Sequence, residues 1–317
     1  MSAPAKVESL RDAYGQALLE LGERDPKLIV LDADLSGSTR TVLFGKKFPD
    51  RFYNVGVMEP TMMSIAAGFS LEGRTVYAST FAVFAAGQAY NFVRQSICYN
   101  RANVKIVATH GGLLVGPDGG THQIVEDIGL MRGLPGMTVI VPADAPTARA
   151  ATFAVAEREG PAYVRLTRES LPTVTDGSFQ IGRAAELRSG SDLTIVAVGA
   201  LVARALEVAG ELAEIGISTR VLDLASVKPF DEPALLRAAR DTGAILVLEE
   251  HSVLTGVGAL VAATTGENYP VPVRRVGVPD LFGESGEAWA LLDRFGMSKE
   301  RIREEAWELL RLRGKVQ

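Results

Sequence analysis

Short runs of apolar, often β-branched residues alternate along the chain with longer stretches of helical periodicity. In the first half the short runs predict strands at residues 27–32, 52–56, 75–80, 104–110, 138–143 and 162–167. The stretches between them predict helices at 7–22, 60–71, 86–99, 124–132 and 145–158. Strands that alternate with helices in this way are typical of parallel α/β layers.

The alternation pauses at the polar, turn-rich segment LPTVTDGSFQIG (171–182), which is typical of a linker. It resumes with predicted strands at 192–199, 219–224, 244–250 and 273–278, and with predicted helices at 201–215, 231–240, 256–265, 286–295 and 299–312. We therefore predict an α/β protein of two consecutive domains with mostly parallel sheets, at residues 1–176 and 184–317.

Composition and charge limit the classes of ligand and the cellular compartment that we expect for this protein. The net charge of −5 gives no broad attraction to nucleic acid or to an anionic membrane, so an anionic ligand must be held by a few placed cations. The single cysteine, Cys98, excludes an intrachain disulfide and indicates a reducing compartment. The start MSAPAKVESL lacks the apolar core of a signal peptide, and the longest apolar runs are too short to span a bilayer. We expect a soluble, cytoplasmic protein.

Chemically distinctive side chains follow the predicted strands of the first domain. In open parallel sheets, ligands bind beyond the carboxyl ends of the strands. The residues at those ends are Asp32, Asp34, Glu59, Phe81, Phe84, His110 and Arg168. The second domain offers fewer such groups, at 249–252 and at Asp280, so we expect the chemistry in the first domain.

The loop THGGLLVGPDGGTHQ (109–123) holds two of the only three histidines, His110 and His122, with Asp118 and five glycines between them. Three interpretations are open: an Ω-like loop with solvated histidines, a metal site formed by His110, Asp118 and His122, or a polar pocket. In a pocket the imidazoles would hydrogen-bond hydroxyls or shuttle protons, and glycines would let the backbone approach a substrate. The density of glycines favours the pocket.

Three other features allow two interpretations each. Glu59 beside Pro60 is an ordinary helix start, or a desolvated carboxyl group that shares a proton with a ligand nitrogen. Phe81 and Phe84 are plain core, or they flank a flat heterocycle. The third feature comprises Arg11, Ser38 and Arg168. These residues are ordinary surface, or they converge on one phosphate.

Several motifs, taken in their order and spacing, resemble the C-terminal half of a transketolase over essentially the whole chain. They are DADLSGS (32–38), GVMEP (56–60), TFAVF (80–84), the loop 109–123, VRLTRESLP (164–172) and LEEHSVLTGVG (248–258). That half comprises the pyrimidine-binding domain and the C-terminal domain of a thiamine diphosphate-dependent enzyme. The resemblance implies that this chain is a separate subunit of a split transketolase.

The resemblance also implies roles for the cofactor pocket. Glu59 would contact N1′ of the aminopyrimidine, and Phe81 and Phe84 would wall that ring. A third aromatic residue of the family falls near Gly87 or Gln88 here, so that wall is missing or replaced. Asp34 would lie near the thiazolium ring and the bound sugar.

For the sugar, the resemblance implies that His122 and Asp118 face the reacting carbonyl and its hydroxyls. The phosphate would be held by His110, Arg168, Ser38 and Arg11. The segment GPDGGTHQ departs from the family, which more often has an acidic residue before the aspartate and a proline before the threonine.

The chain lacks GxGxxG, GxxxxGK[ST] and GDG motifs, and therefore its own diphosphate cradle. The resemblance implies a partner chain that carries the diphosphate site and the Mg²⁺ ligands, with no metal ligand in this chain and an inactive subunit in isolation. We expect an α2β2 assembly. The alternatives are the β subunit of a 2-oxoacid dehydrogenase E1 component, a deoxyxylulose-phosphate synthase, and a non-catalytic scaffold paralogue.

Overall fold

The first sheet is built mainly from the N-terminal half of the chain and is parallel except at one edge. The structure is a computed structural model that describes residues 6–314. The sheet order is β12 (Ser226–Lys228), β6 (Thr138–Ile140), β7 (Ala162–Arg165), β5 (Val104–Thr109), β4 (Val76–Phe81), β2 (Ile29–Asp32) and β3 (Phe52–Asn54). The strands β2, β4, β5, β6 and β7 are buried along their whole length, as expected for parallel strands covered by helices on both faces.

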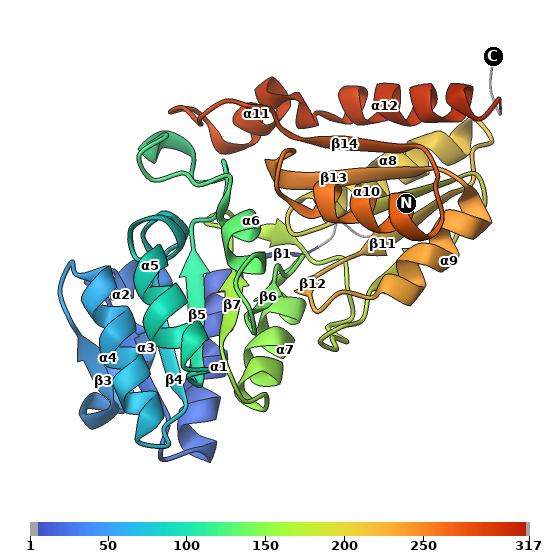
Figure 1. Ribbon diagram of the computed structural model, residues 1–317. Coiled ribbons are helices and arrows are strands. Elements are labelled where there is room, and N and C mark those ends of the chain that lie inside the picture. Colours follow the sequence, from blue (N-terminus) through green and yellow to red (C-terminus); the bar gives the residue numbers. More distant parts are fainter. Residues whose placement is uncertain (1–5, 315–317) are drawn as a thin grey trace.

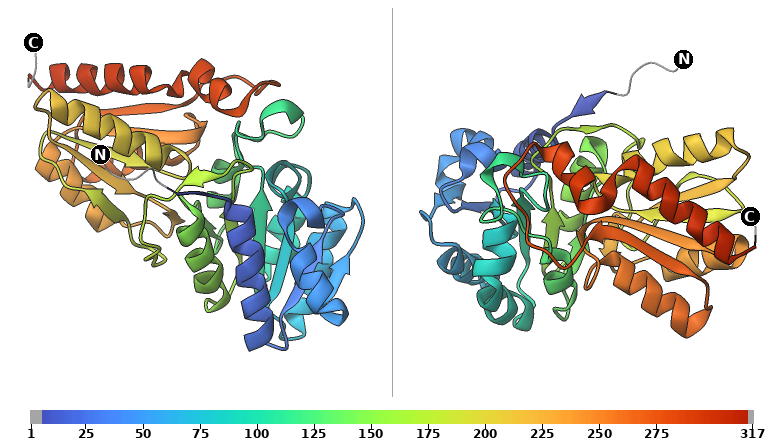
Figure 2. Two further views of the ribbon diagram at one scale, coloured as in Figure 1. Left: turned by 180° about the vertical axis from the view of Figure 1, so that it is seen from behind. Right: turned by 90° about the horizontal axis from the view of Figure 1, so that it is seen from above.

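Helices cover both faces of this sheet (Figures 1 and 2). α1 (Leu10–Arg24) and α7 (Ala145–Ala156) pack against each other on one face, with α3 (Val42–Lys47) beside α1. The other face carries α4 (Glu59–Leu71), the π-helical turns Val83–Gln88 and Val93–Tyr99 around α5 (Tyr90–Phe92), and α6 (Asp127–Arg132). Short elements fill the loops: α2 (Ser36–Thr39) and the 3₁₀ turns Pro49–Arg51 and Gly116–Asp118.

The second sheet has the order β14 (Val273–Val278), β13 (Ile245–Ser252), β10 (Leu193–Ala197), β11 (Thr219–Asp223) and β9 (Ala185–Arg188), and β9 alone pairs antiparallel. α8 (Leu201–Glu214) and α12 (Lys299–Leu312) pack together on one face, and α9 (Glu232–Thr242) and α10 (Val257–Asn268) on the other. α11 (Ala288–Leu292) and the π turn Asp293–Met297 precede α12. Side-chain caps start several of these helices, as Asp231 does for α9 and Ser298 for α12.

The two domains share more than a linker. β12 belongs to the second half of the chain but extends the first sheet by pairing antiparallel with β6. Both apolar layers continue from one domain into the other, so that Val139 and Val141 lie in one core cluster with Val196 and Leu222. The domains are therefore joined by a common core.

The predicted fold class is confirmed, while several predicted elements differ in detail. The helix expected at 7–22 begins at Leu10, because Val7–Glu8 (β1) pairs with Leu171–Pro172 (β8) inside the expected linker. The helix expected at 86–99 is instead a series of π turns around α5, and the one expected from 124 begins only at Asp127. The helix expected at 286–295 spans Ala288–Leu292 before the π turn. β9 and β12 were not predicted, because edge strands this short leave no clear apolar pattern.

Candidate functional site

Glu59 is both a helix start and a buried carboxyl group. It is the first residue of α4, followed by Pro60, and its side chain is only 1% exposed. Thr80, near the end of β4, donates its hydroxyl to Glu59 Oε1 at 3.4 Å. Within the described chain Oε2 is buried and has no hydrogen-bond donor. A buried carboxylate oxygen left unpaired is costly, so this atom is suited to a donor from a bound ligand.

Phe81, Phe84 and the two loop histidines form one cluster of rings. The rings of Phe81 and His110 stack with centroids 3.7 Å apart, and the ring of His122 meets Phe84 edge-on at 5.7 Å and Phe81 at 6.4 Å. Phe81 and Phe84 are nearly parallel with centroids 5.9 Å apart. A flat ring between them would need about 7 Å, twice the contact distance of about 3.5 Å. The two phenylalanines therefore make a single wall. The place of the third aromatic residue carries Gly87 and Gln88, both exposed.

His110 is held in a strained backbone conformation directly after β5. Its φ is +59°, a left-handed value uncommon for a side-chain-bearing residue, and Asp34 after β2 has φ +66°. His110 is 3% exposed, and its Nδ1 lies 2.9 Å from the hydroxyl of Thr109. Burial, together with Arg11, Arg168 and His122, lowers the pKa of His110 to about 3. The imidazole is therefore neutral at physiological pH and can act as a hydrogen-bonding group without a fixed charge.

Arginines gather beside this ring cluster. Arg11 donates to the main-chain oxygens of Ser38 (3.1 Å) and Arg168 (3.0 Å). Arg168 donates to Val115 O at 2.6 Å. Burial, then Arg40 and Arg168, lower the pKa of the Arg11 guanidinium. Like charges held this close favour an anion, and Arg11 and Arg168 are called the arginine group below. Arg40 also lies near Arg11 and was missed in the sequence, but its Nε already pairs with Asp12 Oδ1 at 2.7 Å.

Two acidic candidates lie in different surroundings. Asp118, at the 3₁₀ turn of the loop, pairs with Arg168 at 3.3 Å, and both side chains are about a third exposed (38% and 33%). An ion pair this exposed is weak and leaves Asp118 free to exchange partners. Asp34 accepts from Asn54 Nδ2 at 2.9 Å, and its own N–H donates to Asn54 Oδ1 at 3.1 Å. Asp32 is structural: it accepts from Leu35 N–H and from the hydroxyls of Thr39 and Thr41.

The loop glycines have a role other than the expected approach to a substrate. A Cβ at Gly111 would lie 2.7 Å from Cγ of Arg165, and one at Gly112 would collide with the Glu250 carboxylate. A Cβ at Gly119 would collide with Ser285, and one at Gly120 would lie 2.6 Å from Gly283 O. These glycines therefore let the second domain and Arg165 pack against the loop. The sequence analysis did not single out Arg165 and noted Glu250 only as one of the few polar groups of the second domain. A charge inside a buried strand is nevertheless itself a signal of a buried partner.

The described residues offer other features as well. Within residues 6–314 no group of three or more His, Cys, Asp or Glu side chains is placed to hold a metal ion. The same residues include no helix that is long and apolar enough to cross a bilayer.

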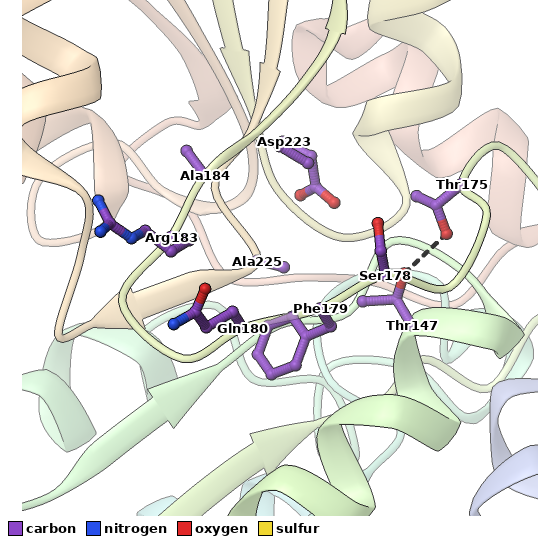
Figure 3. A pocket seen from close by; sticks show the side chains of 10 residues that line it. Thr147, Thr175, Ser178, Phe179, Gln180, Arg183, Ala184, Asp223 and Ala225 are labelled. Atoms are coloured by element: carbon purple, nitrogen blue, oxygen red, sulfur yellow. Dashed lines mark hydrogen bonds between the residues drawn. The ribbon is translucent and has the colours of Figure 1, made fainter.

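A separate cavity of about 400 Å³ lies where the linker 175–185 passes Thr147, Asp223 and Ala225 (Figure 3). Burial, with a smaller effect from Asp144, raises the pKa of Asp223 there to about 8. None of the candidate residues described above lines this cavity.

Comparison with known families assigns both halves of the chain. The family profile for the transketolase pyrimidine-binding domain matches residues 7–174, and that for the transketolase C-terminal domain matches residues 182–302. The fold and these matches define a two-domain subunit whose pyrimidine-binding domain implies dependence on thiamine diphosphate.

Individual relatives narrow this class further. A protein of Methanocaldococcus jannaschii named "Putative transketolase C-terminal section" is 41% identical over 306 residues, covering 95% of this chain and 96% of the relative. A "6-deoxy-6-sulfo-D-fructose transketolase subunit SqwH" from a Clostridium species is 41% identical over 302 residues, covering 95% and 94%. A solved structure described as "Split gene transketolase, inactive beta4 tetramer" matches with a TM-score of 0.90 at 49% identity, covering 96% of this chain and 99% of that one. The chain therefore belongs to the transketolase family, as the C-terminal subunit of a split enzyme.

Proposed function

We propose that this subunit, together with a partner chain, transfers a two-carbon ketol unit from a ketose phosphate to an aldose phosphate with thiamine diphosphate as cofactor. The observation that carries the proposal is the unpaired, buried Oε2 of Glu59. Glu59 lies at the C-terminal end of the first sheet. The wall formed by Phe81 and Phe84 and the arginine group lie at the same end. A ring nitrogen, a flat ring and an anion would each meet a matching group of this chain.

The residues present fit the cofactor. Glu59 would hold a proton between Oε2 and a nitrogen of the aminopyrimidine, and the wall of Phe81 and Phe84 would support that ring from one side. Asp34 would lie towards the thiazolium ring. When bound, thiamine diphosphate supplies a carbon nucleophile and an electron sink for the two-carbon unit.

The remaining candidates would bind and orient the sugar. His122 and Asp118 would contact the carbonyl and the adjacent hydroxyls, where His122 can take up or release a proton as the carbon–carbon bond breaks. Neutral His110 would hydrogen-bond the far end of the sugar without adding charge. The guanidinium groups of Arg11 and Arg168, with Ser38, would hold the terminal phosphate.

The partner would complete the cofactor site. We infer that a second chain supplies the diphosphate cradle and the oxygen ligands of Mg²⁺, in an α2β2 assembly, because this sequence lacks the corresponding motifs. The relative described as an inactive β4 tetramer is consistent with a subunit that is inactive by itself. The sulfo-sugar named for another relative indicates that the terminal anion of the substrate can differ within the family.

The test is reconstitution. The chain alone, and the chain mixed with the candidate partner, are incubated with thiamine diphosphate, Mg²⁺, xylulose 5-phosphate and ribose 5-phosphate, and release of glyceraldehyde 3-phosphate is followed. A parallel reaction uses 6-deoxy-6-sulfofructose as the donor and follows consumption of ribose 5-phosphate, which reports on the terminal anion. We expect turnover only in the mixture.

Glu59→Gln provides the matched variant. Because the amide cannot share a proton with the cofactor, we expect turnover to fall by about 100-fold or more while the subunits still assemble. Full activity of Glu59→Gln would contradict the role of Glu59. Activity of the chain alone would contradict the split site, and turnover of pyruvate but of neither sugar would favour a 2-oxoacid enzyme.

A further inference from the structure

Glu250 ties the second domain to the histidine loop. It lies near the carboxyl end of β13 and is 2% exposed. Its Oε1 accepts the main-chain N–H of Leu114 at 2.6 Å, across 136 residues of sequence. Leu114 stands midway between His110 and Asp118. One side chain of the second domain therefore fixes the middle of the loop that carries the proposed sugar-binding residues.

Arg165 holds Glu250 in place from the first domain. Its guanidinium donates from Nη2 to the main-chain oxygen of Glu250 at 3.0 Å, and its Nη1 lies 3.8 Å from Oε2. The same guanidinium donates from Nε to Asp127 Oδ2 at 3.0 Å, and Tyr163 donates its hydroxyl to that oxygen at 2.7 Å. These side chains are all buried, so their hydrogen bonds leave little freedom of orientation.

Both the glycines and the far end of the loop are adapted to this contact. Gly111 and Gly112 leave the space that Arg165 and Glu250 occupy. At the other end, Gln123 donates to Leu113 O at 3.3 Å and to Glu284 O, in the segment before α11, at 3.0 Å. Figure 1 shows the green loop beside the red segment that leads into α11. The loop is therefore bound to the second domain at its middle and at its end.

We propose that Glu250 is a positioning residue for the sugar site: by binding the backbone N–H of Leu114 it fixes where His110, Asp118 and His122 present their side chains. The catalytic part of this inference rests on the proposed function, whereas the anchoring of the loop does not. The second domain thus contributes to the site through Glu250 without touching the substrate.

The chain offers a matched control in the neighbouring residue. Glu249 is also fully buried on β13, but its carboxylate accepts from the N–H groups of Val257 and Gly258 at the start of α10. Among residues 6–314 it forms no hydrogen bond or ion pair with the loop. Glu249→Gln and Glu250→Gln therefore remove the same charge, from adjacent buried positions, with only the second change reaching the loop.

Hydrogen–deuterium exchange of the isolated chain, read by mass spectrometry, tests the anchoring. In Glu250→Gln the neutral amide accepts the Leu114 N–H more weakly than a carboxylate and loses the ion pair with Arg165, so peptides covering 110–118 should exchange about 10-fold to 100-fold faster, with β4 unchanged. Glu249→Gln should accelerate α10 and leave the loop as in the wild type. Unchanged exchange in the loop of Glu250→Gln, or equal acceleration of loop and β4, would overturn the proposal.

Reconstituted enzyme tests the consequence for the reaction. Glu250→Gln should lower kcat/KM for the sugar by about 10-fold or more, with cofactor affinity unchanged, because misplaced sugar-binding residues weaken the reacting geometry. Glu249→Gln should stay close to the wild type. Normal kcat/KM in Glu250→Gln despite a loosened loop would overturn the positioning role. A wild-type mixture without activity would count against the proposed function only, since the exchange result is independent of turnover.

Discussion

Glu59 and Asp223 each bury a carboxylate oxygen that has no hydrogen-bond donor among the described residues. Their surroundings differ. Glu59 lies beside the ring cluster and the arginine group, whereas Asp223 faces the cavity at the linker, with Asp144 as the nearby charge that affects its ionisation. The same atomic feature is therefore a candidate cofactor contact in one place and a source of pH-dependent stability in the other.

The pKa of Asp223 makes a prediction about stability. Burial raises it to about 8, above the unfolded value of about 4, so folding takes up a proton between these pH values. The stability that Asp223 contributes to the folded protein is fully present below about pH 4 and is lost as the pH rises through about 8. In Asp223→Asn the side chain at this position cannot ionise. The free energy of unfolding of the variant, relative to that of the wild type, should therefore increase as the pH rises.

Urea unfolding of both proteins at about pH 5.5 and about pH 8.5 measures this difference. Asp280→Asn, a change of the same kind at an exposed position, serves as the control. A difference between Asp223→Asn and the wild type that is the same at both pH values would show that Asp223 does not change ionisation on folding.

Among the elements, α7 shows how one cap can organise two segments. Its N-cap, Asp144, accepts from Thr147 N–H at 3.0 Å, which starts the helix. The same carboxylate accepts from the N–H groups of Val174 and Thr175, at 2.9 Å and 2.7 Å, and from the hydroxyl of Thr175. The helix start and the beginning of the linker are therefore held by one buried side chain.

Asp144→Ala should destabilise the protein by about 3 kcal/mol, because a helix cap is lost and one buried and two partly buried N–H groups lose a charged acceptor. Asp176→Ala is the control, since the hydrogen bonds of this exposed linker residue within residues 6–314 go to nearby Ser178. Urea unfolding midpoints and slopes of both variants give the comparison. Equal midpoints for Asp144→Ala and Asp176→Ala would contradict the double role of Asp144.

The whole molecule is held together by contacts that the linker does not provide. β12 completes the first sheet, the apolar layers run through both domains, and Glu250 pairs with Arg165 between them. A chain cut in the linker should therefore remain one particle.

A protease site inserted after the exposed Ser178 allows this cut. After cleavage we expect the two halves to elute together in gel filtration and to separate only in denaturant. Residues 1–176 expressed alone should aggregate, because loss of β12 leaves the edge of β6 unpaired. Separate elution of two folded halves would support domains that are independent at the proposed boundaries, 1–176 and 184–317.

The amino-acid sequence by itself determined the positions of the central strands and the α/β class. Buried parallel strands such as β4 and β5 need continuous apolar runs, and that requirement is visible locally. The order of its motifs also placed the chain in its family. The same motifs contain residues that the fold brings together. The ring cluster consists of His110, His122, Phe81 and Phe84, and Arg11 contacts Arg168.

Only the tertiary structure decided which segments meet. A three-residue strand such as β12 carries too little pattern to reveal its partner in the other domain. The glycines of the loop indicated close approach, but Glu250 and Arg165, rather than a ligand, occupy the space beside Gly111 and Gly112. Such pairings join residues far apart in the sequence: Ser226 and Ile140 are 86 positions apart, and Leu114 and Glu250 are 136 apart. They depend on the packing of two complete domains, and no local stretch of sequence can specify that packing.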